Sequence, residues 1–231
     1  MSGAIPPELG DLSNLSELTL AENQLSGSIP SELGNLSNLR HIHFAGNQLS
    51  GPIPVALADL HSLQSLYLHK NLLNGPIPPQ LGDLPNLVIL FLSENQLTGP
   101  IPPELGSIAS LERLWIGNNP LSEPIPIELT YLPSLARLFV GQSQVSGPVP
   151  PELGDVSTLT HLNFHSSSLT GPLPQSMTRL QHLNLLLFHR TGLCAPTNET
   201  FQTWIRGVPN VRGPNCGSSE SNEAWETSEG L

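Results

Sequence analysis

The sequence predicts an α/β solenoid: a right-handed coil with a parallel β-sheet on its concave side and 3-10 turns on its convex side. Three observations with one period predict it. Leucine-like residues return every 24 positions, a short apolar-polar alternation follows each of them, and a proline precedes each by six positions. The leucine-like residues are Leu12, Leu36, Leu60, Leu84, Ile108, Leu132, Val156 and Leu180. A fixed period of this length is typical of repeat proteins, in which each repeat contacts only its neighbours.

Each repeat is expected to contribute one short strand. In the first repeat, Leu18 and Leu20 alternate with Glu17 and Thr19, as a strand with one buried face requires. The next strand begins 24 residues later in the same direction. Neighbouring strands must therefore be parallel, and the chain must return across the opposite side.

The return segment carries the recurring proline. Proline fixes φ and removes a hydrogen-bond donor, which suits a short 3-10 turn better than a full helix. We therefore expect convex 3-10 turns at Pro6, Pro30, Pro54, Pro78, Pro102, Pro126, Pro150 and Pro174.

A polar side chain recurs where the chain must turn away from each strand. A buried carboxamide there can bond loop backbone groups repeat after repeat. The set is Asn23, Asn47, Asn71, Asn95 and Asn119, followed by the weaker hydroxyls of Ser143, Ser167 and Thr191. In the fifth repeat Glu123 stands where six other copies carry glycine, and Pro120 follows the turn asparagine, so we expect a local distortion of the backbone.

The full phrase of the first repeat is Leu12, Leu15, Leu18, Leu20, Asn23, Leu25, Gly27, Ile29, Pro30, Leu33 and Gly34. This pattern, with its Leu-x-Gly-x-Ile-Pro segment, resembles the plant-specific subfamily of leucine-rich repeats over residues 3–193. That subfamily occurs in plant receptor-kinase ectodomains, receptor-like proteins and polygalacturonase inhibitors. The resemblance implies a horseshoe fold and a binding role, because receptor ectodomains of this class often bind small peptides along the strand face.

Three regions are expected along the chain. Residues 1–193 form about eight leucine-rich repeats. They open in mid-repeat at Gly3, without the cysteine-paired N-terminal cap that the resembled proteins usually have, so we expect the chain to be part of a longer protein. Residues 194–216 form a C-terminal cap, and residues 217–231, rich in Ser and Glu, form a disordered acidic tail.

The cap is flanked by Cys194 and Cys216, the only cysteines. Between them the period breaks, and apolar residues fall at helical spacing at Phe201, Trp204, Ile205 and Val208. We expect a short amphipathic helix over the last leucine layer and a disulfide, which implies an oxidising compartment. The alternatives are two free thiols in a cytosolic protein or a metal-binding pair.

The net charge of −11 argues against nucleic-acid and anionic-lipid partners. No run of about 18 apolar residues exists, so we expect no membrane contact by this segment, and any signal peptide lies outside it. Together with a disulfide, this favours an extracellular or cell-surface location for a secreted protein. The sequons at Asn14, Asn35 and Asn198 are candidate glycosylation sites of a glycoprotein.

The outward strand positions form columns across the repeats, with neighbours about 4.8 Å apart. The central column reads Thr19, His43, Tyr67, Phe91, Trp115, Phe139, Asn163 and Leu187. Exposed aromatic and arginine side chains favour binding. We therefore predict ligand contacts at His43, Tyr67, Phe91, Arg113, Trp115, Arg137, Phe139, His161 and His165. The alternative is that these large side chains only pack against one another along the sheet.

Arg113 and Arg137 are neighbours in a flanking column, where they form a candidate clamp for a carboxylate or sulfate. The resemblance supports the clamp, because receptors of this class sometimes hold an anionic peptide end with paired arginines. The alternative is a solvated pair screened by Glu112. We accordingly expect an anionic protein or peptide partner.

The histidines of this face are expected to charge together between about pH 7 and 5 and to make the face basic. They are His41, His43, His69, His161, His165 and His189. No carboxylate or thiolate converges on His165 and His189, so no metal site and no cofactor are expected.

We find no convergent carboxylate pair, nucleophile elbow or phosphate loop, so no enzyme activity is expected. The prediction is an extracellular protein- or peptide-binding module that resembles a receptor ectodomain and binds on its concave face. The alternatives are a secreted inhibitor of the polygalacturonase-inhibitor type and a structural or ice-binding extracellular solenoid, which would use a flat, regular surface.

Overall fold

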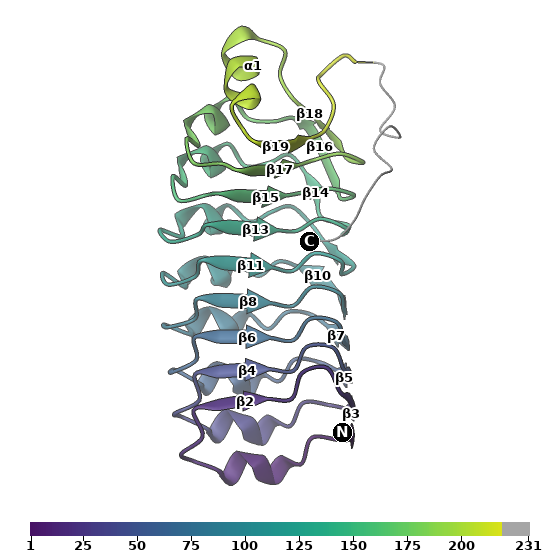
Figure 1. Cartoon of the computed structure of the whole chain (residues 1–231), viewed down its shortest axis with the longest axis vertical. Coiled ribbons are helices and arrows are strands. Elements are labelled where there is room, and N and C mark those ends of the chain that lie inside the picture. The colour runs from purple at the N-terminus through teal and green to yellow at the C-terminus, as the bar shows by residue number, and fades with distance from the viewer. Residues whose placement is uncertain (219–231) are drawn as a thin grey trace.

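The computed structural model describes residues 1–218 and shows a stack of similar coils along one long axis (Figure 1). One parallel sheet of nine strands runs the length of the stack in chain order, which confirms the predicted concave sheet. Its strands are β2 (Glu17–Thr19), β4 (His41–His43), β6 (Ser65–Tyr67), β8 (Ile89–Phe91), β11 (Arg113–Trp115), β13 (Arg137–Phe139), β15 (His161–Asn163), β17 (Leu185–Leu187) and β19 (Asn210–Arg212). None of the helices in residues 1–218 is long and apolar enough to cross a membrane.

Each concave strand buries its middle residue. Leu66 of β6 is fully buried and pairs with Ile42 on one side and Leu90 on the other. The register therefore steps by one repeat per strand and brings equivalent residues side by side. The leucine columns of the sequence become one continuous core as a result.

The convex side carries eight 3-10 helices, as predicted. They are η1 (Pro7–Asp11), η2 (Ser31–Asn35), η3 (Val55–Asp59), η4 (Pro79–Asp83), η5 (Pro103–Ser107), η6 (Ile127–Tyr131), η7 (Pro151–Asp155) and η8 (Gln175–Arg179). Each begins directly after its recurring proline. A glycine in most of them allows close packing: a Cβ on Gly106 would lie 2.4 Å from the backbone oxygen of Glu128. Ala58 and Thr130 replace this glycine in η3 and η6, which pack less closely on the helix that follows.

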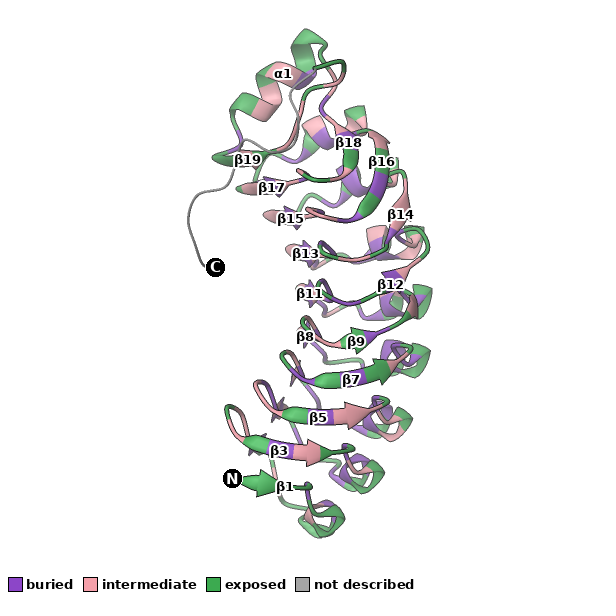
Figure 2. Ribbon diagram, turned by 90° about the vertical axis from the view of Figure 1, so that its right-hand side faces the viewer, coloured by how far each residue is buried: buried purple, intermediate pink, exposed green. Residues whose placement is uncertain are grey.

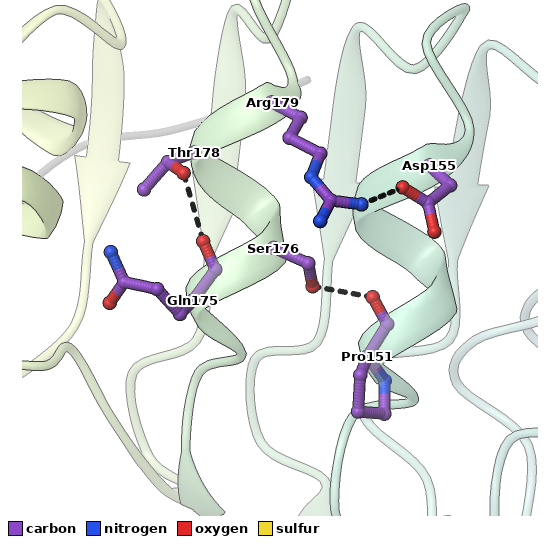
Figure 3. Close-up of polar contacts among 6 residues, drawn as sticks. All are labelled: Pro151, Asp155, Gln175, Ser176, Thr178 and Arg179. Atoms are coloured by element: carbon purple, nitrogen blue, oxygen red, sulfur yellow. Dashed lines mark hydrogen bonds and ion pairs between the residues drawn. The ribbon is translucent and has the colours of Figure 1, made fainter.

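Polar contacts join the last two 3-10 helices (Figure 3). Arg179 forms an ion pair with Asp155, and the Ser176 hydroxyl donates to the carbonyl oxygen of Pro151. Because both charged side chains are largely exposed, the ion pair contributes about 0–1 kcal/mol. The convex stack is therefore stabilised mainly by packing.

A second set of parallel strands runs along one side of the stack and was not expected from the sequence (Figure 2). We call it the lateral sheet. Its strands are β1 (Ser2–Gly3), β3 (Gln24–Gly27), β5 (Gln48–Gly51), β7 (Leu72–Gly75), β9 (Gln96–Leu97), β10 (Gly99–Pro100), β12 (Leu121–Ser122), β14 (Ser146–Gly147), β16 (Ser168–Pro172) and β18 (Gly192–Cys194). The first five form one continuous sheet, and pairing is interrupted on either side of β10 and β12.

The expected distortion of the fifth repeat is confined to this interruption. Glu123 adopts a φ of 66°, in the left-handed region where Gly99 and Gly147 have φ of 80° and 77°. Beyond Glu123, a single bridge between Pro124 and Ser146 replaces a regular strand pair. Glu123 thus adopts the same backbone conformation as the glycines of other repeats. This conformation is less favourable for glutamate, because a Cβ atom is strained at positive φ.

The asparagine ladder connects successive repeats as predicted. The Nδ2 of Asn71 donates to the carbonyl oxygens of Phe44 and Leu68 at 2.9 and 3.1 Å. Its Oδ1 accepts the N–H of Leu49 at 3.0 Å. The same bonds recur at Asn47, Asn95 and Asn119. Each carboxamide therefore satisfies backbone groups of its own repeat and of the repeat before it.

The later hydroxyls serve their own repeat. Ser143 donates to the carbonyl oxygen of Val140 at 2.6 Å and accepts the N–H of Val145 at 3.3 Å. Thr191 makes the same pair of bonds. The shorter side chain closes the local turn without bonding the preceding repeat.

The cap contains the expected helix, α1 (Glu199–Arg206). Its N-terminus is capped by Asn198, whose Oδ1 accepts the N–H of Phe201 at 3.0 Å. Phe201 is buried in the core, and the Trp204 indole donates to the carbonyl oxygen of Leu180 at 3.2 Å. The helix therefore covers the last leucine layer.

The predicted disulfide joins Cys194 and Cys216, so the free-thiol and metal-pair alternatives are wrong. Between the cysteines the chain also forms β19, which pairs with β17 and places Val211 opposite Leu186. This ninth strand of the concave sheet was not expected. Of the tail at 217–231, the prediction for residues 219–231 lies outside the described residues.

Candidate functional site

Five ring-bearing side chains lie side by side across the concave sheet, and we call them the aromatic row: His43, Tyr67, Phe91, Trp115 and Phe139. Successive ring centroids are 4.9, 6.2, 4.4 and 5.5 Å apart. All five are half-buried. The rings pack on one another, as the alternative explanation held, and still present part of their surface to solvent. Mutual packing fixes their positions before any partner arrives.

A groove of about 970 Å³ follows the C-terminal half of the concave face, and we call it the C-terminal groove. Six of the predicted contact residues line it: Phe91, Trp115, Arg137, Phe139, His161 and His165. Leu185, Leu187 and His189 extend the lining toward the cap. The groove therefore combines aromatic and leucine side chains with cationic and neutral polar groups and one carboxylate, that of Glu94.

The remaining predicted contact residues lie elsewhere. His43 and Tyr67 line a separate hollow of about 510 Å³ at the N-terminal end, together with His41 and Ser65. There the Nδ1 of His41 lies 2.7 Å from the Ser65 hydroxyl. Arg113 lines neither hollow.

The cap supplies groove residues that sequence reasoning missed. Pro209, Asn210, Val211 and Arg212 form the end of the C-terminal groove, because β19 extends the concave sheet. The available signal was the polar-apolar-polar run at 210–212, which matches the alternation of the other concave strands. Only the pairing with β17 places it beside the repeats.

The C-terminal half of this face concentrates positive charge in an acidic chain. Arg113, Arg137, Arg190 and Arg212 are half of the chain's 8 lysines and arginines. Within residues 1–218 the one ion pair is that of Arg179 on the convex side, so Glu112 makes no direct ion pair with Arg113, and both the anion clamp and the solvated pair screened by Glu112 stay predictions. Arg113 and Arg137 are register neighbours, as predicted.

The neutral form of His69 is favoured. Burial lowers its pKa to about 4, with the charges of His43 and Lys70 adding to the effect. Its ring stacks on Phe91, with centroids 3.7 Å apart. A proton on this imidazole would lie in a poorly hydrated site, which explains the direction of the shift.

The histidines of the C-terminal groove behave in the same way. Burial lowers the pKa of His161, and Arg137 lowers it further. Burial also lowers the pKa of His165 and of His189, whose rings stack with centroids 5.2 Å apart, and Arg212 adds to the shift of His189. The expectation that the histidines charge together between about pH 7 and 5 is therefore wrong, because burial and neighbouring cations oppose protonation.

The predicted sequons are all at exposed asparagines, Asn14, Asn35 and Asn198. The Nδ2 of Asn198 donates to Gln175 at 3.0 Å in addition to its helix-capping role. Residues 1–218 contain no group of three or more His, Cys, Asp or Glu side chains placed to hold a metal ion.

The lateral sheet differs in chemistry from the concave face. Its strands and the residues that follow them carry one charged side chain, Glu123, across segments 24–28, 48–52, 72–76, 96–100, 120–124, 144–148 and 168–172. Exposed positions include amides and hydroxyls such as Gln24, Gln48, Asn74 and Thr98, and also Leu72 and prolines that follow the strands. The result is a nearly uncharged surface.

Comparison with known proteins agrees with this architecture. A Leucine rich repeat family model matches residues 13–73, and a second Leucine Rich Repeat model matches residues 86–108 and 110–132. No curated protein sequence matches the chain.

Several solved structures are similar. The LRR ectodomain of the plant membrane receptor kinase GASSHO1/SCHENGEN3 from Arabidopsis thaliana, in complex with CASPARIAN STRIP INTEGRITY FACTOR 2, has a TM-score of 0.82 at 28% identity. A TDR receptor has a TM-score of 0.85 at 31% identity. Each match covers 91% of this chain but only 25% and 37% of the receptor chains. A plant ice-binding protein has a TM-score of 0.68 at 27% identity, over 95% of this chain and 81% of that one.

Four findings lead to the same assignment: the repeat phrase, the parallel concave sheet with its 3-10 helices, the matching family models and the similar receptor ectodomains. The chain is a leucine-rich-repeat protein of the plant type.

Proposed function

We propose that this chain is an extracellular binding module that takes a peptide or protein segment on its concave face, as a receptor ectodomain does. The observation that carries the proposal is the C-terminal groove, where pre-packed aromatic rings and Arg137 line about 970 Å³. Rigid aromatic and arginine side chains dominate the energetics of protein interfaces, because they bury a large area at little entropic cost. No catalytic role is proposed.

Two further findings support this function. The GASSHO1/SCHENGEN3 and TDR structures are receptors, and the first holds its partner in the complex. The disulfide between Cys194 and Cys216 fits an oxidising compartment outside the cytosol. An anionic partner suits Arg137 and Arg212, which have no carboxylate within ion-pair distance among residues 1–218.

The test is a binding screen of the disulfide-intact chain against a synthetic peptide library and a panel of secreted proteins, including polygalacturonases. Hits are titrated against Trp115→Ala, which removes a large aromatic side chain from the groove lining. We expect the loss of a buried aromatic anchor to cost about 2 kcal/mol or more, roughly thirty-fold in Kd. A polygalacturonase as the only hit would favour the inhibitor alternative on the same face.

The matched control is Tyr131→Ala on η6, an aromatic side chain that is 65% exposed on the convex side. It should leave binding unchanged. Circular dichroism and thermal unfolding of both variants show whether the fold is retained. Retained binding in folded Trp115→Ala, with loss in Tyr131→Ala, would place recognition on the convex side and contradict the proposal.

A second candidate function has its own supporting observation. The lateral sheet is nearly uncharged, and one similar structure is a plant ice-binding protein that this chain matches over most of its length. Repeated hydroxyls and amides on β3, β5, β7 and β9 suit an uncharged, ordered surface such as ice. We therefore include ice adhesion by the lateral sheet as the alternative.

Ice-affinity partitioning separates the two functions. If the lateral sheet binds ice, Thr98→Lys, which adds a charge to an exposed position there, should reduce incorporation into ice, and Trp115→Ala should not. Exclusion of the unaltered chain from ice would remove this candidate and leave peptide binding standing alone.

A further inference from the structure

The cap makes the C-terminal groove a composite site. β19 places Arg212 opposite Leu187, in line with the aromatic row, while Arg137 lies on β13 in the flanking column. Both arginines line the groove, and neither has a carboxylate within ion-pair distance among residues 1–218. Two separate cationic groups therefore face one continuous groove.

The spacing of these arginines follows from the register. Three strand steps separate β13 from β19, and the Arg212 position lies two residues further along the strand than the Arg137 column. At about 4.8 Å per strand and 3.3 Å per residue, the two Cα atoms lie roughly 16 Å apart. Because arginine side chains are long, the distance between the two guanidinium groups can differ from the Cα separation by a few ångströms.

An extended peptide has a matching period. Its side chains alternate sides, and it rises about 3.3 Å per residue. Residues i and i+4 therefore point the same way at roughly 13 Å, within reach of both guanidinium groups, whereas residue i+5 points away. Acidic side chains four residues apart fit the two arginines.

The floor between the arginines is apolar on β17 and polar on β15. Leu185 and Leu187 of β17 are half-buried and line the groove, whereas β15 contributes His161 and Asn163. In a peptide held at positions i and i+4, residue i+2 faces this floor. An apolar side chain at i+2 would bury its surface on the leucines.

The arginine charges reach into the groove. Arg137 and Arg212 contribute to the lowered pKa values of His161 and His189, so each guanidinium lies close to a neutral imidazole rather than a counter-ion. Because the chain as a whole carries a charge of −11, the two arginines make the end of the groove near the cap more favourable to an acidic ligand than the average surface, while Glu94 lines the groove at β8.

We propose that the C-terminal groove binds an extended peptide segment with acidic side chains at i and i+4 and an apolar side chain at i+2, one carboxylate at Arg137 and the other at Arg212. The inference rests on the proposed peptide-binding function and adds the charge spacing of the ligand. It also makes the cap strand β19 part of the binding site.

The experiment is fluorescence anisotropy with the whole disulfide-intact chain and a labelled peptide, Gly-Ser-Gly-Glu-Ser-Leu-Ser-Glu-Gly-Ser. Three comparison peptides replace both Glu by Gln, replace Leu by Ser, or insert one Ser to give an i, i+5 spacing. Each comparison peptide is expected to bind at least about tenfold more weakly, since each loses a charge-assisted contact or the buried side chain.

On the protein, Arg137→Ala and Arg212→Ala are each expected to weaken binding of the Glu peptide by about tenfold or more. The matched control is Arg206→Ala on the exposed side of α1, away from the groove, which should bind as the unaltered chain does. Thermal unfolding confirms that each variant is folded.

Equal binding of the Gln peptide, or equal loss in the Arg206→Ala variant, would overturn the proposal. Equal binding at i+4 and i+5 spacing, with loss in both groove variants, would reject the charge spacing and leave groove binding intact. If none of the acidic peptides binds, this inference fails, while the library screen with Trp115→Ala still decides the broader function.

Discussion

Replacing one ladder asparagine should destabilise the whole solenoid. Asn71 is 6% exposed, donates to the carbonyl oxygens of Phe44 and Leu68, and accepts the N–H of Leu49. In Asn71→Ala these backbone groups lose their partner in a site too tight for bulk water. A buried group left unsatisfied costs about 1–3 kcal/mol, so we expect a loss of about 3–5 kcal/mol in unfolding free energy. That is a large part of the stability of a typical domain.

The chain itself supplies the intermediate case. Ser143 shows that a hydroxyl at the ladder position bonds groups of its own turn, at Val140 and Val145, and not the preceding repeat. Asn71→Ser should therefore recover the bond to the carbonyl oxygen of Leu68 but leave the N–H of Leu49 and the carbonyl oxygen of Phe44 without this partner. We expect it to lose about two thirds as much stability as Asn71→Ala, roughly 2–3 kcal/mol.

The assay is equilibrium urea unfolding followed by circular dichroism, with the disulfide intact. Asn74→Ala, at an exposed position of β7, is the control and should stay within about 0.5 kcal/mol of the unaltered chain. If Asn71→Ala were within about 1 kcal/mol of the unaltered chain, or Asn71→Ser as unstable as Asn71→Ala, the ladder would not be what joins the repeats.

Four other perturbations test separate parts of the structure. His69 has a pKa of about 4 in the folded chain, below its value in the unfolded chain, so the unfolded chain gains a proton first as pH falls. The free energy of unfolding should therefore fall by roughly 1–2 kcal/mol as pH drops from about 6.5 to 4. Urea unfolding at several pH values should show a smaller pH dependence for His69→Gln. Reduction of the Cys194–Cys216 disulfide, whose cysteines are 22 residues apart, should lower the free energy of unfolding by about 3 kcal/mol and abolish groove binding. Thermal unfolding and anisotropy with and without reductant measure the two effects. Unchanged binding would show that β19 stays in place without the disulfide. Glu123→Gly should raise the unfolding free energy by about 0.5–1 kcal/mol because it relieves a left-handed φ of 66°, and a loss would contradict that account. Gly106→Ala should lower it by about 1–3 kcal/mol because its Cβ would meet a backbone oxygen at 2.4 Å, and a neutral result would mean that η5 and η6 can separate freely.

Most of the fold could be predicted from residue spacing. The period places Leu18, Ile42 and Leu66 in one buried column, and each recurring proline begins a 3-10 helix. Such predictions succeed because each contact in a solenoid joins a residue to its equivalent in the next repeat, so one repeat determines the geometry of all. The ladder of asparagines and the aromatic row follow from the same rule.

The candidate site was only partly predictable. The outward columns correctly brought Trp115 and Phe139 together, yet Arg113 lies outside both hollows and the groove extends onto the cap. Because the cap breaks the period, its position could not be extrapolated from the repeats. Arg212 lies in the site only because β19 pairs with β17. The lateral sheet was missed for a related reason, since its strands pair 22 rather than 24 residues apart.

The sequence by itself determined the repeat, the buried columns and the ladder, because these depend on local pattern and on contacts between equivalent residues. The tertiary structure alone decided which outward side chains share a groove, how the cap completes it, and that His69 and His165 favour their neutral form. Burial, stacking and the distance between charges arise only when strands from separate repeats and the cap lie side by side, and no one-dimensional pattern records them.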